Sequence, residues 1–288
     1  MDPYNPIIAA HRAAAGAPRA RWAARIDAAP PPFWLALQLL ALWPALWWTA
    51  RRVADGSDDP LGLVALSLLA IAAVGGQLAC RREARLPWLA AALGATVLAT
   101  ALSATLPPLA HALLAGVALA CAWAAFRAER TPVLPVLGLL WLALPLLASL
   151  QFYAGFPLRA VTAWLSAGLL QGLGVAAQAA GASVLVDGRL VLVDAPCSGV
   201  QLAWFAYCAA SAAALWQGVP DRRFVRRLPW VGLAALLGNA LRNTVLVAVE
   251  GGLLPWPAWT HDATGLVVLG AVCAIAVRLM AAEQADAR

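Results

Sequence analysis

The segment LPWVGLAALLGNALRNTVLVAVE, residues 228–250, is a long apolar run with one arginine, Arg242, inside it. A bilayer core about 30 Å thick is crossed by about 20 mostly apolar residues in a helix, so this segment predicts a transmembrane helix. A charged arginine costs roughly 2.5–3.5 kcal/mol inside such a helix, so Arg242 is expected to face a protein interior or a wet cavity. A structural tie between helices is the alternative role for this side chain.

Apolar runs of similar length recur along the whole chain. Of its 288 residues 63% are hydrophobic and 12% are charged, which leaves too little polar surface to cover a soluble globule. Besides 228–249, spans are predicted at 33–50, 61–80, 86–106, 108–126, 132–151, 199–217 and 264–281. A further stretch, 158–180, has polar residues such as Thr162 and Ser166 on one flank and favours an interfacial helix.

The arginines predict the orientation of these spans, because basic residues near short loops favour the cytoplasmic side. All 20 basic residues are arginines, and eight spans with cytoplasmic termini place 15 of them in cytoplasmic segments. Nine spans with a cytoplasmic C-terminus would move the arginines of 81–85 and 127–130 to the outer face, so eight spans are preferred. Topology also explains the net charge of +6, and no nucleic-acid partner is expected.

The expected fold is an all-α polytopic membrane protein of about eight transmembrane helices, with a small extracytoplasmic hairpin and an interfacial helix. Its parts are a cytoplasmic tail (1–32), five transmembrane helices (33–151), an extracytoplasmic loop (152–198), three transmembrane helices forming the catalytic half (199–281) and a cytoplasmic tail (282–288). In the loop, Asp187-Gly188 lies between two arms rich in valine and leucine. Asp-Gly at such a place predicts a β-hairpin, with a plain connector loop as the alternative.

One of the five cysteines, Cys197, lies where this polar loop meets the sixth span. Cys80, Cys121, Cys208 and Cys273 lie within or at the ends of apolar runs and are expected to pack. The cysteines form no CxxC pair and have no metal-ligand spacing with the histidines, so neither a metal site nor a disulfide framework is expected. Ser198 and Gly199 can begin the next helix, whose N-terminus favours a thiolate on Cys197.

Two further side chains are expected at the same membrane face as Cys197. Arg242, with Asn239 and Asn243 beside it, lies about seven residues, or roughly 10 Å, below the outer end of its span. His261 precedes the last span, and the adjacent Asp262 could hydrogen-bond to it. A thiolate that attacks a carbonyl, a histidine that moves protons and a cation that stabilises negative charge together indicate nucleophilic catalysis, which needs no cofactor.

The CSG that opens the sixth span, the arginine of NALRN and the histidine of HDATG resemble the signature of the exosortase and archaeosortase family of membrane cysteine transpeptidases. The resemblance covers residues 152–281 in motif order. It implies a Cys197 nucleophile with His261 as acid/base and Arg242 as transition-state stabiliser, although these two roles are partly exchangeable. Ser198, Gly199, Asn239, Asn243 and Asp262 are possible supporting residues.

The resemblance also implies substrates and a location. The substrates would be secreted proteins with a C-terminal sorting signal, made of a short motif, a transmembrane helix and a basic tail, and often of the PEP-CTERM type. A thioester acyl-enzyme would form at the extracytoplasmic face of the bacterial inner membrane, and an amine or water would resolve it. The resemblance implies no metal or other cofactor, and it leaves the oligomeric state open.

Three other functions are consistent with parts of the pattern. A transporter could use Arg242 and its neighbouring asparagines to line a polar pathway, but this leaves the outer cysteine and histidine unexplained. The chain could also be a non-catalytic subunit of an envelope or exopolysaccharide machine. A rhomboid-like serine protease using Ser198 would lack an evident second catalytic partner.

Overall fold

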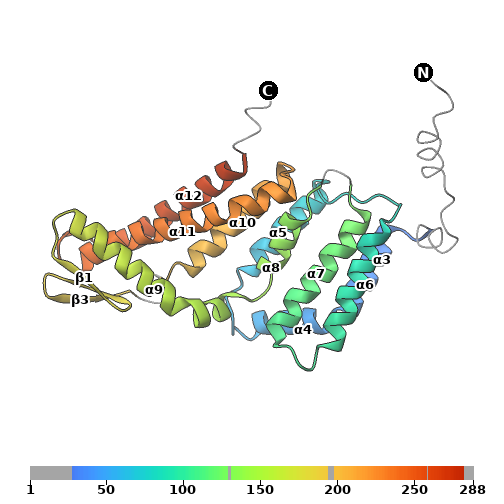
Figure 1. Cartoon of the computed structure of the whole chain (residues 1–288), viewed down its shortest axis with the longest axis horizontal. Helices are drawn as coiled ribbons and strands as arrows, with labels where there is room; N and C mark the ends of the chain where they lie inside the picture. The colour runs from blue at the N-terminus through green and yellow to red at the C-terminus, as the bar shows by residue number, and fades with distance from the viewer. Residues whose placement is uncertain (1–27, 129–130, 194–197, 258, 282–288) are drawn as a thin grey trace, which may run out of the picture.

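Each apolar segment that the sequence marks as a span contains helix in the computed structural model of the chain (Figure 1). The structure describes residues 28–128, 131–193, 198–257 and 259–281. The helices are α3 (Pro31–Ala41), α4 (Trp43–Ala54), α5 (Gly62–Val74), α6 (Leu86–Ala101), α7 (Pro108–Phe126), α8 (Leu134–Leu142), α9 (Leu147–Gly172), α10 (Val200–Trp216), α11 (Asp221–Glu250) and α12 (Thr260–Ala281). The strands are β1 (Ala177–Ala180), β2 (Ser183–Val186) and β3 (Arg189–Leu192).

The described helices differ in whether they can cross a bilayer alone. The helices α7, α11 and α12 are long and apolar enough, and the count rises to five if α3 with α4 and α8 with α9 are each one broken span. These two pairs bend by 69° and 92°, near Pro44 and Pro145, and proline interrupts helical hydrogen bonding. The helices α5, α6 and α10 are apolar but shorter. The expected count of eight spans therefore stays a prediction.

The chain between the fifth and sixth expected spans differs from the sequence-based prediction. The helix expected over 158–180 instead begins earlier, at Leu147, and ends at Gly172 as α9, and residues 177–180 form β1. Its interfacial position stays a prediction. The flank with Thr162 and Ser166 is buried within the protein, where both side chains are 0% exposed. The polar residues on this helix therefore contact another helix. Hydropathy alone cannot distinguish such a buried polar contact from exposure to water.

Next to α9 lies a three-stranded antiparallel sheet in the order β1-β2-β3. Strands β2 and β3 form the hairpin expected at Asp187-Gly188, with Val186 paired to Arg189. Asp187 and Gly188 have φ angles of 46° and 80°, and positive values at both positions are those that a type I′ turn requires. Strand β1 was not predicted, because AQAA has no β-branched residue to indicate a strand.

Small residues bring the last three helices close together. Their shared core contains Ala206, Ala210 and Ala214 of α10, and a Cβ on Gly238 of α11 would lie only 2.5 Å from a Val272 methyl of α12. Membrane helices use such small residues for close packing, because lipid provides no hydrophobic force between them.

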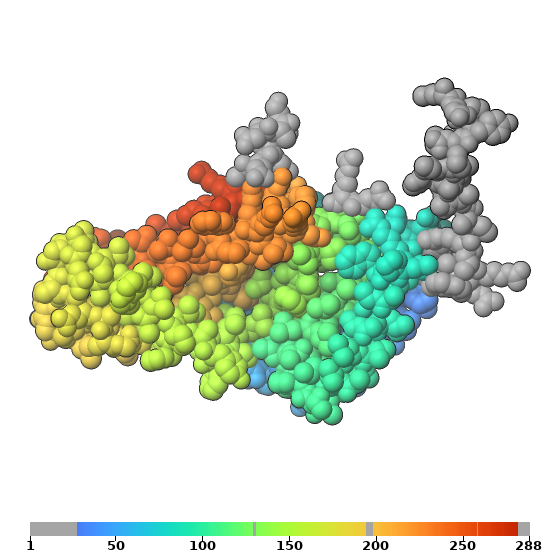
Figure 2. Space-filling model, in the orientation of Figure 1, coloured from blue at the N-terminus to red at the C-terminus, as the bar shows by residue number. Residues whose placement is uncertain are grey.

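A second apolar core lies at the other end of α11. There α9 and the sheet pack on the last turns of α11, around Leu170, Val184 and Val247. Figure 1 shows this assembly at the left of the molecule, and Figure 2 shows the sheet as the yellow end of an elongated body. The first turn of α10 and the middle of α11 lie between these two cores.

Candidate active site

The start of α10 depends on a glycine. Gly199 is the N-cap residue and has a φ of +83°, a left-handed conformation that side chains with a Cβ rarely adopt. A Cβ at this position would also lie 2.8 Å from Nδ2 of Asn239 on α11. Gly199 therefore lets the chain turn into α10 while its backbone contacts α11. Cys197, the expected nucleophile, lies two positions earlier, outside the described residues.

Arg242 lies beside a groove between α10, α11 and the start of α12. The groove has a volume of about 420 Å³, and its polar lining consists of Gln201, Asn239, Arg242 and Asp262. The Nε atom of Arg242 is buried and has no hydrogen-bond partner among the described residues. A cation held in this way can stabilise negative charge that enters the groove.

Room for the arginine comes from a glycine on α12. A Cβ on Gly265 would lie 3.4 Å from the Arg242 Nε atom and 3.6 Å from Nη2, so any longer side chain would enter the space of the guanidinium. Arg242 lies within a helix that is long and apolar enough to cross a membrane. Its guanidinium occupies this polar space instead of facing lipid, where a charge is costly. The expectation that Arg242 faces a protein cavity is confirmed.

His261 lies in the first turn of α12, next to this groove. Its Nδ1 atom is 3.5 Å from Oδ1 of Asp262, and the two side chains are 44% and 90% exposed. Asp262 lines the groove with Arg242, whereas the residues that line the groove do not include His261. The histidine is therefore half exposed at the edge of the site, where it can exchange protons with water or with a bound group.

The middle of α11 is anchored to α9 by two buried pairs of polar side chains. The Asn239 amide donates from Nδ2 to Oγ1 of Thr162 over 3.1 Å, and the Asn243 amide donates to Oγ of Ser166 over 3.0 Å. The Ser166 hydroxyl in turn donates to the backbone carbonyl of Ala240 over 3.2 Å. We call these five residues the polar seam. Because Asn239 and Asn243 bracket Arg242 in sequence, the seam fixes the height and rotation of α11 at the arginine.

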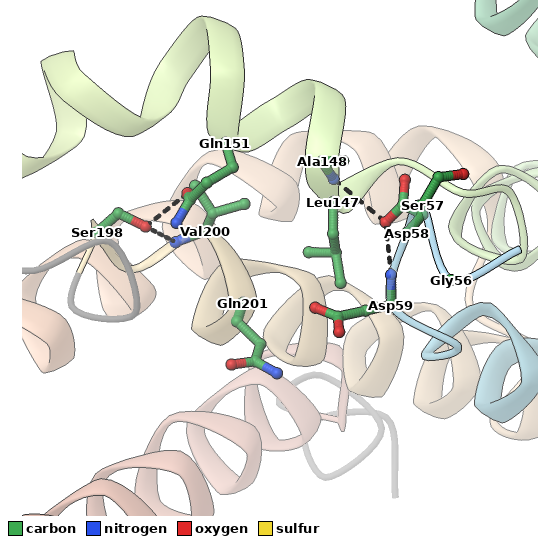
Figure 3. A pocket seen from close by; sticks show the side chains of 10 residues that line it. All are labelled: Gly56, Ser57, Asp58, Asp59, Leu147, Ala148, Gln151, Ser198, Val200 and Gln201. Carbon is green, nitrogen blue, oxygen red and sulfur yellow. Dashed lines mark hydrogen bonds between the residues drawn. The ribbon is translucent and has the colours of Figure 1, made fainter. Parts of the chain in front are cut away.

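A second groove lies on the other side of the α10 start (Figure 3). Ser198 is 3% exposed, and its hydroxyl donates to Oε1 of Gln151 on α9 over 2.8 Å. This groove, of about 390 Å³, is also lined by Asp58 and Asp59 from the turn before α5. Gln201 lines both grooves, so the first turn of α10 separates the acidic groove from the Arg242 groove.

The structure therefore brings some of the expected site residues together and separates others. Asn239, Arg242 and Asp262 share one groove, and Gly199 contacts it through Asn239. Asn243 belongs to the polar seam, and the Ser198 hydroxyl is bonded to Gln151. The sequence analysis missed Thr162 and Ser166 as partners of α11, although their spacing of four residues matches that of Asn239 and Asn243.

Among the residues that the structure describes, no group of three His, Cys, Asp or Glu side chains could hold a metal ion. The expectation that no cofactor is needed stays a prediction.

A family model described as transmembrane exosortase matches residues 76–278 of the chain, a range that includes Cys197, Arg242 and His261. No curated protein and no solved structure gives a significant match.

Proposed function

The chain belongs to the transmembrane exosortase family, and from this membership we propose that it is a membrane-embedded cysteine transpeptidase. It cleaves C-terminal sorting signals of secreted proteins through a thioester on the extracytoplasmic face. The main observation in support is the Arg242 guanidinium, whose buried Nε atom has no hydrogen-bond partner in the described part of the chain. It borders a groove at the first turn of α10, directly after the CSG motif.

The proposed reaction has two stages. In the first, the Cys197 thiolate attacks the carbonyl carbon of the scissile peptide bond, and Arg242 stabilises the negative charge that develops on the carbonyl oxygen. His261 donates a proton to the departing amine, which leaves with the transmembrane helix of the substrate. In the second stage, His261 takes a proton from the acceptor, an amine or water, which attacks the thioester carbonyl and releases the Cys197 thiolate.

The arrangement around the grooves is consistent with these roles. Asp262 lines the groove of Arg242, and its Oδ1 atom is 3.5 Å from Nδ1 of His261. A carboxylate at this position can orient the imidazole. We therefore assign Asp262 a positioning role and keep the catalytic roles for Cys197, Arg242 and His261.

The proposed location is the bacterial inner membrane, with eight spans, cytoplasmic termini and the site at the outer face. Three helices can cross a membrane by length and composition, and the number rises to five if each bent pair is one span. Three shorter apolar helices would complete the proposed eight. The proposed substrates carry a short motif, a transmembrane helix and a basic tail. The site would meet the motif where it leaves the membrane.

The proposal is tested in intact cells that secrete a reporter fused to such a C-terminal tail. The unmodified chain is expected to shorten the reporter, and Cys197→Ser, Arg242→Ala and His261→Ala are expected to abolish the shortening. Mass spectrometry of the reporter locates the cleavage, and trapping with Cys197→Ala identifies the bound substrate. Matched controls are Cys273→Ser and His111→Ala, which remove the same side chains away from the grooves.

The outcomes separate the candidate functions. Loss of cleavage in the three site variants, at unchanged membrane levels and with active controls, supports the thiol mechanism. Cleavage that survives Cys197→Ser rejects that mechanism and favours the serine-protease alternative at Ser198. A chain that never cleaves but whose loss stops polymer export would instead be a transporter or a subunit of an envelope machine.

A further inference from the structure

A basic groove lies at the N-terminal end of α11, far from the candidate active site. Figure 1 shows that the turn from α10 into α11 is at the opposite end of α11 from the sheet. The groove has a volume of about 730 Å³ and is lined by Arg222, Arg223, Arg226, Arg227, Trp230 and Leu279. The proposed reaction uses none of these residues.

The groove has four guanidinium groups, and no carboxylate from the described part of the chain lines it. The nearest acid in the sequence, Asp221, faces α8, where its Oδ1 atom accepts from the backbone N–H groups of Val133 and Leu134, each over 2.8 Å. Arg227 donates to the backbone carbonyl of Leu279 at the end of α12, which fixes one wall. Arg222 and Arg226 are exposed and one helical turn apart. The N-terminus of α11 adds its own positive dipole.

The length of α11 places this groove at the level of lipid headgroups. The helix has 30 residues, and so is about 45 Å long. A bilayer core takes about 20 of these residues, which the segment from Trp230 to Glu250 supplies. The preceding turns, with the four arginines, then lie in the headgroup layer. Trp230 is 60% exposed at the boundary, the depth at which tryptophan is enriched in membrane proteins.

We propose that this groove binds the phosphate group of an anionic phospholipid from the adjacent leaflet. Arg222 and Arg226 contact the phosphate oxygens, for which the planar guanidinium is well suited. The indole of Trp230 packs against the glycerol and upper acyl chain. The orientation of the spans explains why basic residues lie near this end of α11. It does not explain why four arginines line the same groove, and this arrangement indicates a bound anionic ligand. A cationic peptide is excluded as the occupant by its charge.

The test uses the full-length chain purified in a neutral detergent. Binding of phosphatidylglycerol is measured by native mass spectrometry across a lipid titration, with phosphatidylcholine and inorganic phosphate as comparison ligands. Arg222→Gln/Arg226→Gln is expected to weaken phosphatidylglycerol binding about 25-fold, since each arginine near a membrane surface contributes about 1 kcal/mol and 1.4 kcal/mol is a tenfold change. The unmodified chain is expected to bind phosphatidylcholine and free phosphate much more weakly.

The control variant also removes two positive charges, but from arginines outside the groove. Arg82→Gln/Arg278→Gln replaces two exposed arginines that do not line the groove, and its phosphatidylglycerol binding should stay within about twofold of the unmodified chain. Equal weakening by both double variants would mean a general charge effect and would overturn the site. Binding of free phosphate as tight as that of the lipid would also overturn it, in favour of a phosphate-ion site. Should the groove double variant not reach the membrane, Arg226→Gln alone is expected to weaken binding about fivefold.

Discussion

Replacing Gly199 by alanine is expected to lower the free energy of unfolding by about 2–5 kcal/mol. Two parts of the structure contribute. A left-handed φ of +83° costs a residue with a Cβ about 1–2 kcal/mol. The new methyl would lie 2.8 Å from Nδ2 and 2.9 Å from Cγ of Asn239, so the amide must move and lose its hydrogen bond to Thr162. The loss of this buried hydrogen bond costs about 1–3 kcal/mol.

The two contributions can be measured separately. Gly174 has nearly the same φ, +82°, but a Cβ there would have no atom within 4 Å, so Gly174→Ala reports the backbone cost alone. The Asn239→Ala background removes the amide from the contact, and in it Gly199→Ala should cost little more than Gly174→Ala. Unfolding is followed by circular dichroism in mixed micelles with increasing dodecyl sulfate. Equal costs for the two glycine variants, or the same Gly199→Ala cost in both backgrounds, would refute the contact with Asn239.

Two further predictions concern Arg242 and the polar seam. Gly265→Leu is expected to displace the guanidinium and reduce reporter cleavage at least tenfold at an unchanged protein level, whereas Gly270→Leu, with open space at its Cβ, should cleave normally. Equal activity of the two leucine variants would contradict the close packing of Gly265 on the arginine. Ser166→Ala is expected to lower the free energy of unfolding by about 1–3 kcal/mol, because it leaves the Asn243 amide buried without its acceptor. The exposed Ser67→Ala is its control and should change stability by less than about 0.5 kcal/mol in the same micelle assay, and a Ser166→Ala change no larger than this would argue against the seam.

Hydropathy and turn chemistry predicted much of this fold. The long apolar runs around α7, α11 and α12 are helical because a span must satisfy its backbone hydrogen bonds internally. Asp187-Gly188 was informative because few dipeptides tolerate positive φ at both positions. The bend between α8 and α9 was missed although Pro145 is present, since a proline can also kink a continuous span.

The candidate site was predictable only in part. The presence of a charge inside an apolar run indicated that Arg242 faces a cavity, and the groove confirms it. The partners of that cavity come from segments far apart in sequence, and no local pattern pairs them. Thr162 and Ser166 resembled the polar flank of a surface helix, because burial against α11 and exposure to water select the same residue types. The position of Cys197 relative to the groove stays a prediction.

The polar seam also has a consequence for the order of events during synthesis. Its two side-chain pairs join residues 77 positions apart. A ribosome that adds about 5–20 residues per second needs about 4–15 s to make that length. Until then the hydroxyls of Thr162 and Ser166 have only carbonyls of their own helix to bond, as serine and threonine in membrane helices commonly do. The nascent α9 therefore reaches its final hydrogen bonds only when the ribosome has passed Asn243, and a chain stalled before that point presents an incompletely bonded helix to membrane quality control.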